Sequence, residues 1–258
     1  MKNDFINNQI LIKFINMKIK FTFFIVVSWM ALITSAQETK ILNSNISIGV
    51  DFASMYLWRG FELGNGPAIQ PWGEFSYKGF TLGAWGSYEF TGEFKEVDLY
   101  SKYTYKDLSL LFVDLFLPDY EGLDLNFFNF KNKTTGHISE LALSFNGTEK
   151  IPFSLYGGVI LYGIPIDHKV NGSNASNYSS YFEVNYLGKL KDYSYNVFVG
   201  FTPTESYLYA TEKFSVFNVG LSAKKSIKIA EDFGLPVKLT IASNPVSEKI
   251  FMALLISL

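Results

Sequence analysis

The stretch KIFMALLISL, residues 249–258, alternates apolar side chains with small or polar ones up to the last residue. Side chains on a strand point alternately to opposite faces, so this pattern predicts one apolar face and one polar face. Residues 46–53 repeat the alternation near the other end of the chain. A chain that ends inside a strand predicts that this strand pairs with another. We expect it to close against the first strand of a barrel.

The same alternation recurs between these two stretches, with clusters of turn-forming residues in between. It predicts strands at about 44–59, 67–77, 80–90, 96–105, 108–117, 138–146, 152–162, 177–187, 193–202, 213–223, 235–242 and 249–258. We therefore expect an all-β fold, an antiparallel transmembrane β-barrel of about 12 strands in which the N-terminal strand closes on the C-terminal strand.

The predicted connections alternate in length, with the N-terminus taken as periplasmic. Even-numbered connections are mostly tight turns, such as Lys78-Gly79 and Lys106-Asp107, whereas odd-numbered ones include the long segments 118–137 and 163–176. Short turns on one side and long loops on the other are typical of transmembrane barrels. The segment 224–234 is a long even-numbered connection, which predicts either a short helix or a miscounted strand there.

Alternation alone does not say which face meets water. A soluble barrel such as a lipocalin turns its apolar face inward, whereas an outer-membrane barrel reverses this polarity. Aromatic residues such as Tyr56, Trp58 and Tyr105 lie near predicted strand ends, where the interfacial girdles of membrane barrels lie. Charged residues make up 18% of the chain, against roughly 25% in soluble domains. These features favour the membrane barrel.

The N-terminal region indicates export. Lys18 and Lys20 precede an apolar run over 21–33, and small residues follow up to Ala36, the parts of a secretory signal peptide. We expect 1–36 to be an upstream extension plus a cleavable signal peptide, with Met17 as an alternative start, and 37–258 to be a single outer-membrane barrel domain. The expected location is the bacterial outer membrane. A net charge of −2 gives no electrostatic footprint for nucleic acid.

Four spaced motifs resemble the TorF-type porin family. They are SMYLWRG at 54–60, PAIQ at 67–70, GFTLGAWGS at 79–87 and EVDLY at 96–100. The chain differs from that family in the sequence Phe61-Glu62-Leu63 after the first motif and in its last residue, Leu258, where barrels usually end in an aromatic. The resemblance implies an outer-membrane barrel with a porin-like role and names no solute.

The predicted inward face collects charged residues and one tryptophan. These pore-lining candidates are Asp51, Arg59, Glu74, Trp85, Glu89, Glu96, Asp98, Lys102, Glu140, Glu183 and Lys238. Their carboxylates either form a constriction that prefers cations or polar neutral solutes, or brace a narrow lumen through salt bridges. We expect Arg59 to lie near Glu96 or Asp98. Trp85 either offers a stacking platform for a sugar or fills the space beside its neighbouring glycines.

Catalytic motifs are sparse in the chain. His137 and His168 are its two histidines, and Asp167 adjoins His168, so their side chains diverge on an extended segment. The sequence has no metal-ligand spacing and no phosphate-binding loop. We expect no enzyme activity, no cofactor and no metal site. The expected partners are outer-membrane lipid, the barrel-assembly machinery through the C-terminal strand, and a small polar solute. A structural or adhesive barrel with a closed lumen and a lipid-modifying enzyme stay open as alternatives to the porin.

Overall fold

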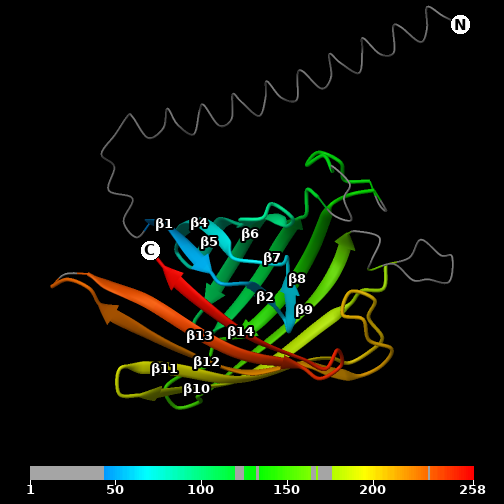
Figure 1. The fold of residues 1–258 in the computed structure, drawn as a ribbon. Coiled ribbons are helices and arrows are strands. Elements are labelled where there is room, and N and C mark those ends of the chain that lie inside the picture. The colour runs from blue at the N-terminus through cyan, green and yellow to red at the C-terminus, as the bar shows by residue number, and fades with distance from the viewer. Residues whose placement is uncertain (1–43, 120–124, 132–133, 164–166, 168–175, 232) are drawn as a thin grey trace, which may run out of the picture. The chain divides into compact units, whose positions relative to one another are not determined.

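The computed structural model describes residues 44–119, 125–131, 134–163, 167, 176–231 and 233–258 (Figure 1). The predicted signal peptide, the alternative start at Met17 and His168 lie outside these ranges. Within them, twelve antiparallel strands close a barrel in the order β1-β14-β13-β12-β11-β10-β9-β8-β7-β6-β5-β4. These strands are β1 (Ser44–Ala53), β4 (Ala68–Tyr77), β5 (Phe80–Glu89), β6 (Lys95–Tyr105), β7 (Leu108–Phe116), β8 (His137–Phe145), β9 (Phe153–Gly163), β10 (Ser180–Leu190), β11 (Tyr193–Thr202), β12 (Ser215–Lys228), β13 (Gly234–Asn244) and β14 (Lys249–Ser257).

The barrel closes where the sequence predicts. β1 and β14 pair antiparallel, with Phe52 opposite Ile256, and Val50 exchanges backbone hydrogen bonds with Leu258 at 2.9 and 3.1 Å. On its other side β1 pairs with β4 along its whole length. The β1–β14 ladder covers the last part of β1, from Val50 to Ala53, and it confirms the predicted seam between the two ends of the barrel.

The apolar face of the strands is the outer face. Ile48 on β1 is 81% exposed and Met252 on β14 is 64% exposed, whereas the carboxylates Glu96 and Glu140 are 2% exposed inside. This polarity, apolar outside and polar inside, fits an outer-membrane barrel.

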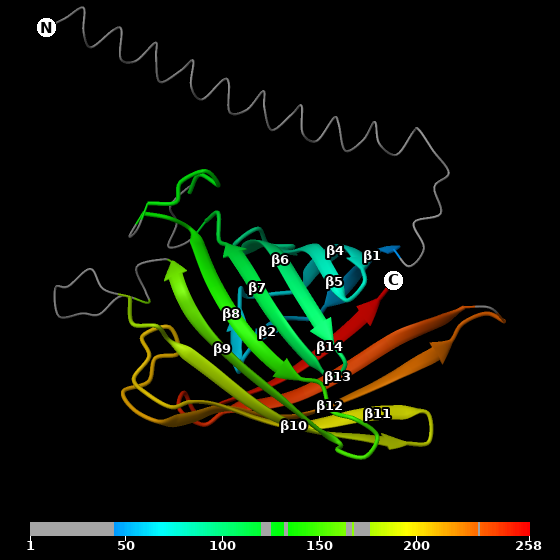
Figure 2. The same cartoon turned by 180° about the vertical axis from the view of Figure 1, so that it is seen from behind.

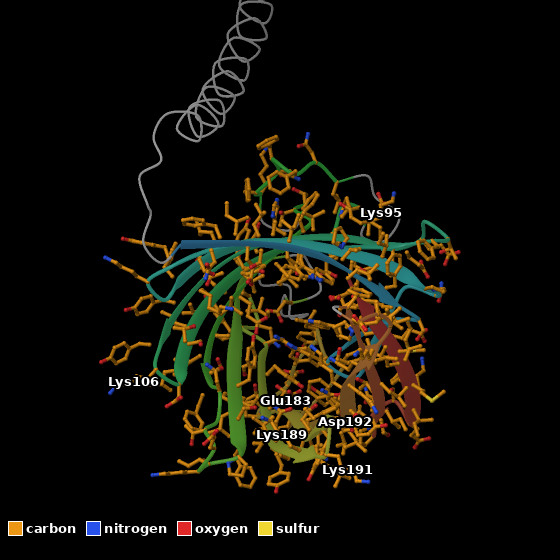
Figure 3. All side chains as sticks on the ribbon, turned by 90° about the vertical axis from the view of Figure 1, so that its left-hand side faces the viewer. Lys95, Lys106, Glu183, Lys189, Lys191 and Asp192 are labelled. Carbon is orange, nitrogen blue, oxygen red and sulfur yellow. The ribbon has the colours of Figure 1, made fainter. Side chains whose placement is uncertain are left out.

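The two rims differ as predicted. Three connections on one rim are two-residue turns, and each begins with a lysine of positive φ: Lys78 at 48°, Lys106 at 54° and Lys191 at 56°. Figure 3 faces this short-turn rim, and Figure 2 shows the longer connections of the opposite rim from behind. The long connection predicted at 224–234 is short in the structure, because β12 extends to Lys228 and β13 begins at Gly234.

The predicted strand 44–59 is wrong in its second half. β1 ends at Ala53, and the following residues form a separate hairpin of β2 (Tyr56–Trp58) and β3 (Phe61–Leu63). The hairpin crosses the inside of the barrel in both Figure 1 and Figure 2. Its turn residues Arg59 and Gly60 have φ angles of 49° and 79°, the positive values of the tightest hairpin turns. A side chain at Gly60 would meet the Phe217 carbonyl oxygen at 2.4 Å.

Candidate functional site: the lumen and its inward hairpin

Arg59 at the tip of the hairpin binds the far wall of the barrel. Its Nη2 donates to both carboxylate oxygens of Glu140 on β8, each at 2.8 Å, and to the Tyr156 hydroxyl on β9 at 3.1 Å. The Tyr156 hydroxyl in turn donates to Glu140 at 2.8 Å. The side chains of Arg59 and Glu140 are 13% and 2% exposed. The tip of the hairpin is therefore fixed by a buried ion pair.

Aromatic rings enclose the Arg59 guanidinium. It lies 4.5 Å from the centre of the Tyr181 ring and 4.8 Å from that of Trp58, positions that favour a cation. Its Nη1 donates to the Tyr209 hydroxyl at 2.6 Å. Tyr209 belongs to the β11–β12 connection, and burial raises the pKa of its hydroxyl to about 12, so this group is a neutral phenol at physiological pH. The contacts with Tyr181 and Tyr209 join the hairpin to β10 and to the β11–β12 connection.

The predicted proximity of Arg59 to Glu96 or Asp98 is wrong. Arg59 pairs with Glu140 instead, because the chain leaves the wall after Ala53 and the inward hairpin carries Arg59 to β8. Glu96 and Asp98 instead hydrogen-bond to each other, and Glu96 also binds Tyr56 on β2. The base of the hairpin therefore lies against the acidic pair while its tip binds Glu140.

Further contacts hold the hairpin along its length. The Asn244 side chain on β13 donates to the Gly60 carbonyl at 3.2 Å, and the backbone NH of Asn65 donates to Glu89 on β5. The Phe61 ring packs 5.8 Å from that of Phe217 on β12. Polar and apolar contacts on several strands thus keep the hairpin inside the barrel.

The remaining candidates from the sequence also belong to the inward face, by strand register and contacts. They are Asp51, Glu74, Trp85, Glu89, Glu96, Asp98, Lys102, Glu140, Glu183 and Lys238. Several of these carboxylates are occupied by neutral donors: Glu74 accepts from the Tyr100 hydroxyl at 2.8 Å, and Glu183 accepts from Asn185 and Asn218, each at 3.0 Å. The Trp85 ring packs 5.3 Å from that of Tyr56, so one of its sides is covered by the hairpin.

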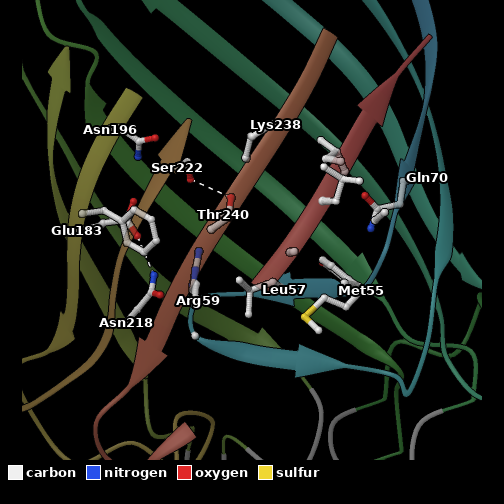
Figure 4. A pocket seen from close by; sticks show the side chains of 17 residues that line it. Met55, Leu57, Arg59, Gln70, Glu183, Asn196, Asn218, Ser222, Lys238 and Thr240 are labelled. Carbon is white, nitrogen blue, oxygen red and sulfur yellow. Dashed lines mark hydrogen bonds between the residues drawn. The ribbon is translucent and has the colours of Figure 1, made fainter. Parts of the chain in front are cut away.

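Two neighbouring cavities remain in the lumen. The first, about 320 Å³, lies beside the hairpin and is lined by Arg59, Asn218 and Thr240 among others (Figure 4). The second, about 730 Å³, reaches the connections of the short-turn rim at 146–149. Asn196, Ser222 and Lys238 line both cavities, so the two adjoin along the lumen. Two lysines of the second cavity, Lys189 and Lys224, are not among the predicted pore-lining residues. The predicted strands end at 187 and 223, so Lys189 lies two residues and Lys224 one residue beyond a predicted end.

His137 lies outside the lumen. It begins β8, where the sequence places the edge of an external loop, and its ring is fully buried. Nδ1 lies 2.7 Å from the Asp114 carboxylate, and Nε2 lies 2.7 Å from the Phe127 carbonyl oxygen. Ser139 donates to Asp114 rather than to the imidazole. The ring therefore fixes the described part of the loop to the wall, and both of its nitrogens are occupied by these contacts.

Comparisons with known proteins give no family. No protein-family model matches the chain, and no curated protein matches its sequence. In the described part of the chain, no group of three or more His, Cys, Asp or Glu is placed to hold a metal ion. The same residues contain no helix that is long and apolar enough to cross a membrane.

Proposed function

We propose that this protein is a porin of the bacterial outer membrane through which small polar solutes diffuse passively. The apolar outer wall supports contact with membrane lipid, because side chains such as Ile48 and Met252 would otherwise face water. β14, which closes the barrel, is the strand that we propose the barrel-assembly machinery engages. The function requires neither a cofactor nor a catalytic residue.

The observation that carries the proposal is the polar lumen with its two adjoining cavities. A purely structural barrel can fill its interior, whereas here space of about 730 Å³ extends from the short-turn rim to the cavity beside the hairpin. We propose that the hairpin narrows this path from the opposite side, where Arg59 and its aromatic neighbours occupy the interior.

A closed structural or adhesive barrel is the second candidate, favoured by the buried pair of Arg59 and Glu140. Single-channel recording in planar bilayers separates the two functions. Refolded protein that migrates as a heat-modifiable barrel on gels should give discrete conductance steps under an applied voltage. Folded barrels that insert into the bilayer and give no steps would favour the closed barrel and contradict the porin.

A further inference from the structure

Three lysines form a row across the inner wall near the short-turn rim. In the strand ladders Lys189 on β10 lies opposite Ser194 on β11, Ser194 lies opposite Lys224 on β12, and Lys224 lies opposite Lys238 on β13. Directly opposed residues project from the same face of a sheet, so the three side chains share one face. We refer to Lys189, Lys224 and Lys238 as the lysine row.

The lysine row faces the larger cavity. All three lysines and Ser194 line the space of about 730 Å³, and Lys238 also lines the cavity beside the hairpin. Glu149 is the one carboxylate among the residues that line the larger cavity. The wall of this cavity therefore carries a local excess of positive charge, although the chain as a whole has a net charge of −2.

The charges of the lysine row are unbalanced in the described part of the chain. None of the three lysines forms an ion pair there, whereas the adjacent Lys225, one position along and on the other face, binds Asp192 at 2.7 Å. Asp51 and Glu183 are the carboxylates that interact electrostatically with Lys238, and Glu183 already accepts hydrogen bonds from Asn185 and Asn218. Like charges directly opposite each other destabilise a sheet. The ammonium groups of Lys224 and Lys238 therefore repel each other, and a bound anion would remove this repulsion.

We propose that the lysine row binds small oxyanions with two or more negative charges, and that such anions are the solutes of the pore. Ammonium groups donate charge-assisted hydrogen bonds to phosphate and carboxylate oxygens. A low-dielectric wall around the cavity also focuses the field of the row on an entering anion. Anion binding is independent of the proposed function, whereas the assignment of the solute rests on it.

Pyrophosphate binding to the detergent-folded protein tests the site without requiring conduction. The affinity is measured by titration calorimetry for the wild type and for a variant that carries Lys189→Gln, Lys224→Gln and Lys238→Gln. The matched control carries Lys78→Gln, Lys106→Gln and Lys191→Gln, which removes the same charge from turns of the same rim. We expect the row variant to bind about tenfold more weakly or worse, and the control to bind nearly as the wild type does. Heat-modifiable migration of all three proteins shows that each is folded.

Two results would overturn the site: no binding to the wild type, or equal losses in the row variant and the control. Conductance in a salt gradient then separates this proposal from the porin itself. Anion selectivity that the row variant loses supports both proposals. Pyrophosphate binding by a folded barrel that does not conduct would keep the anion site and refute the porin. Cation selectivity that is equal in the wild type and the row variant would refute the anion as solute and leave the porin intact.

Discussion

One nitrogen of Arg59, Nη2, lies 2.8 Å from both carboxylate oxygens of Glu140, although the two residues are 81 positions apart in the sequence. This contact joins the tip of the hairpin to the barrel wall. Both side chains are buried inside the barrel. If the hairpin moved away, the Glu140 carboxylate would remain as an unpaired buried charge, which is strongly unfavourable. The pair therefore couples the position of the hairpin to the stability of the barrel.

Removing one partner should destabilise the protein strongly. Arg59→Met leaves the Glu140 carboxylate buried without its cation, and Glu140→Met leaves the guanidinium without its anion, at about 3–5 kcal/mol each. The double variant should cost much less than the sum, because it leaves no unpaired charge. Urea unfolding in detergent or lipid measures all three free energies. Additive losses would show that the two residues do not act as a pair.

Gly158 on β9 provides a second test of the same contact. A side chain at this position would lie 1.9 Å from the Glu140 carboxylate, so Gly158→Ala should displace that carboxylate from Arg59. We expect a loss of about 1–3 kcal/mol in unfolding free energy. Gly73→Ala is the control, because a side chain there meets its nearest neighbour at an ordinary 3.7 Å. Equal effects of the two substitutions would argue against this close approach.

Neighbouring lysines on β12 should respond in opposite directions. Lys224→Gln removes repulsion with Lys238 and should stabilise the barrel by about 0.2–1 kcal/mol. Lys225→Gln instead removes an attraction, since the hydrogen bond from Lys225 favours the ionised Asp192 carboxylate and lowers its pKa. The stability that this ion pair contributes is fully present above the usual pKa of an aspartate, and it is lost as the pH falls through the lowered pKa of Asp192. Unfolding midpoints at neutral pH compare the two; the same sign for both would contradict the assigned contacts.

His137 should control access to the loop that precedes β8. Its ring stacks on Phe130 with centres 4.3 Å apart and hydrogen-bonds to the Phe127 carbonyl. His137→Ala removes both contacts, so chymotrypsin should cleave after these phenylalanines faster than in the wild type. His137→Gln, which can still donate one hydrogen bond, should lie between the two. Equal cleavage rates in all three proteins would show that His137 does not hold the loop.

The barrel is predictable from the sequence because its determinants are local. The alternation along each strand decides which side chains face the inside of the barrel and which face outward. Tight turns such as Lys78-Gly79 decide which strands pair with each other. The hairpin escapes this reasoning because the apolar and aromatic run at 55–58 favours a strand and follows β1 with no glycine or proline in between. Its signal is the pair Arg59-Gly60 between Trp58 and Phe61, which suits a two-residue turn.

The partner of Arg59 is a different case. Local patterns cannot place it beside Glu140, because that contact depends on the closure of the barrel and on the inward course of the hairpin. Lys189 and Lys224 were missed for a simpler reason. Strand ends are uncertain by a few residues in a sequence prediction, and both lysines lie just beyond the predicted ends.

Conductance of a barrel without its hairpin tests the central claim, that the lumen is a path narrowed by β2 and β3. Ala53 and Ala68 are paired directly across β1 and β4, so an Asn-Gly turn can replace residues 54–67 without opening the sheet. In planar bilayers, the folded variant should give larger single-channel steps than the wild type. Steps of equal size in both proteins, or none in either, would contradict this account.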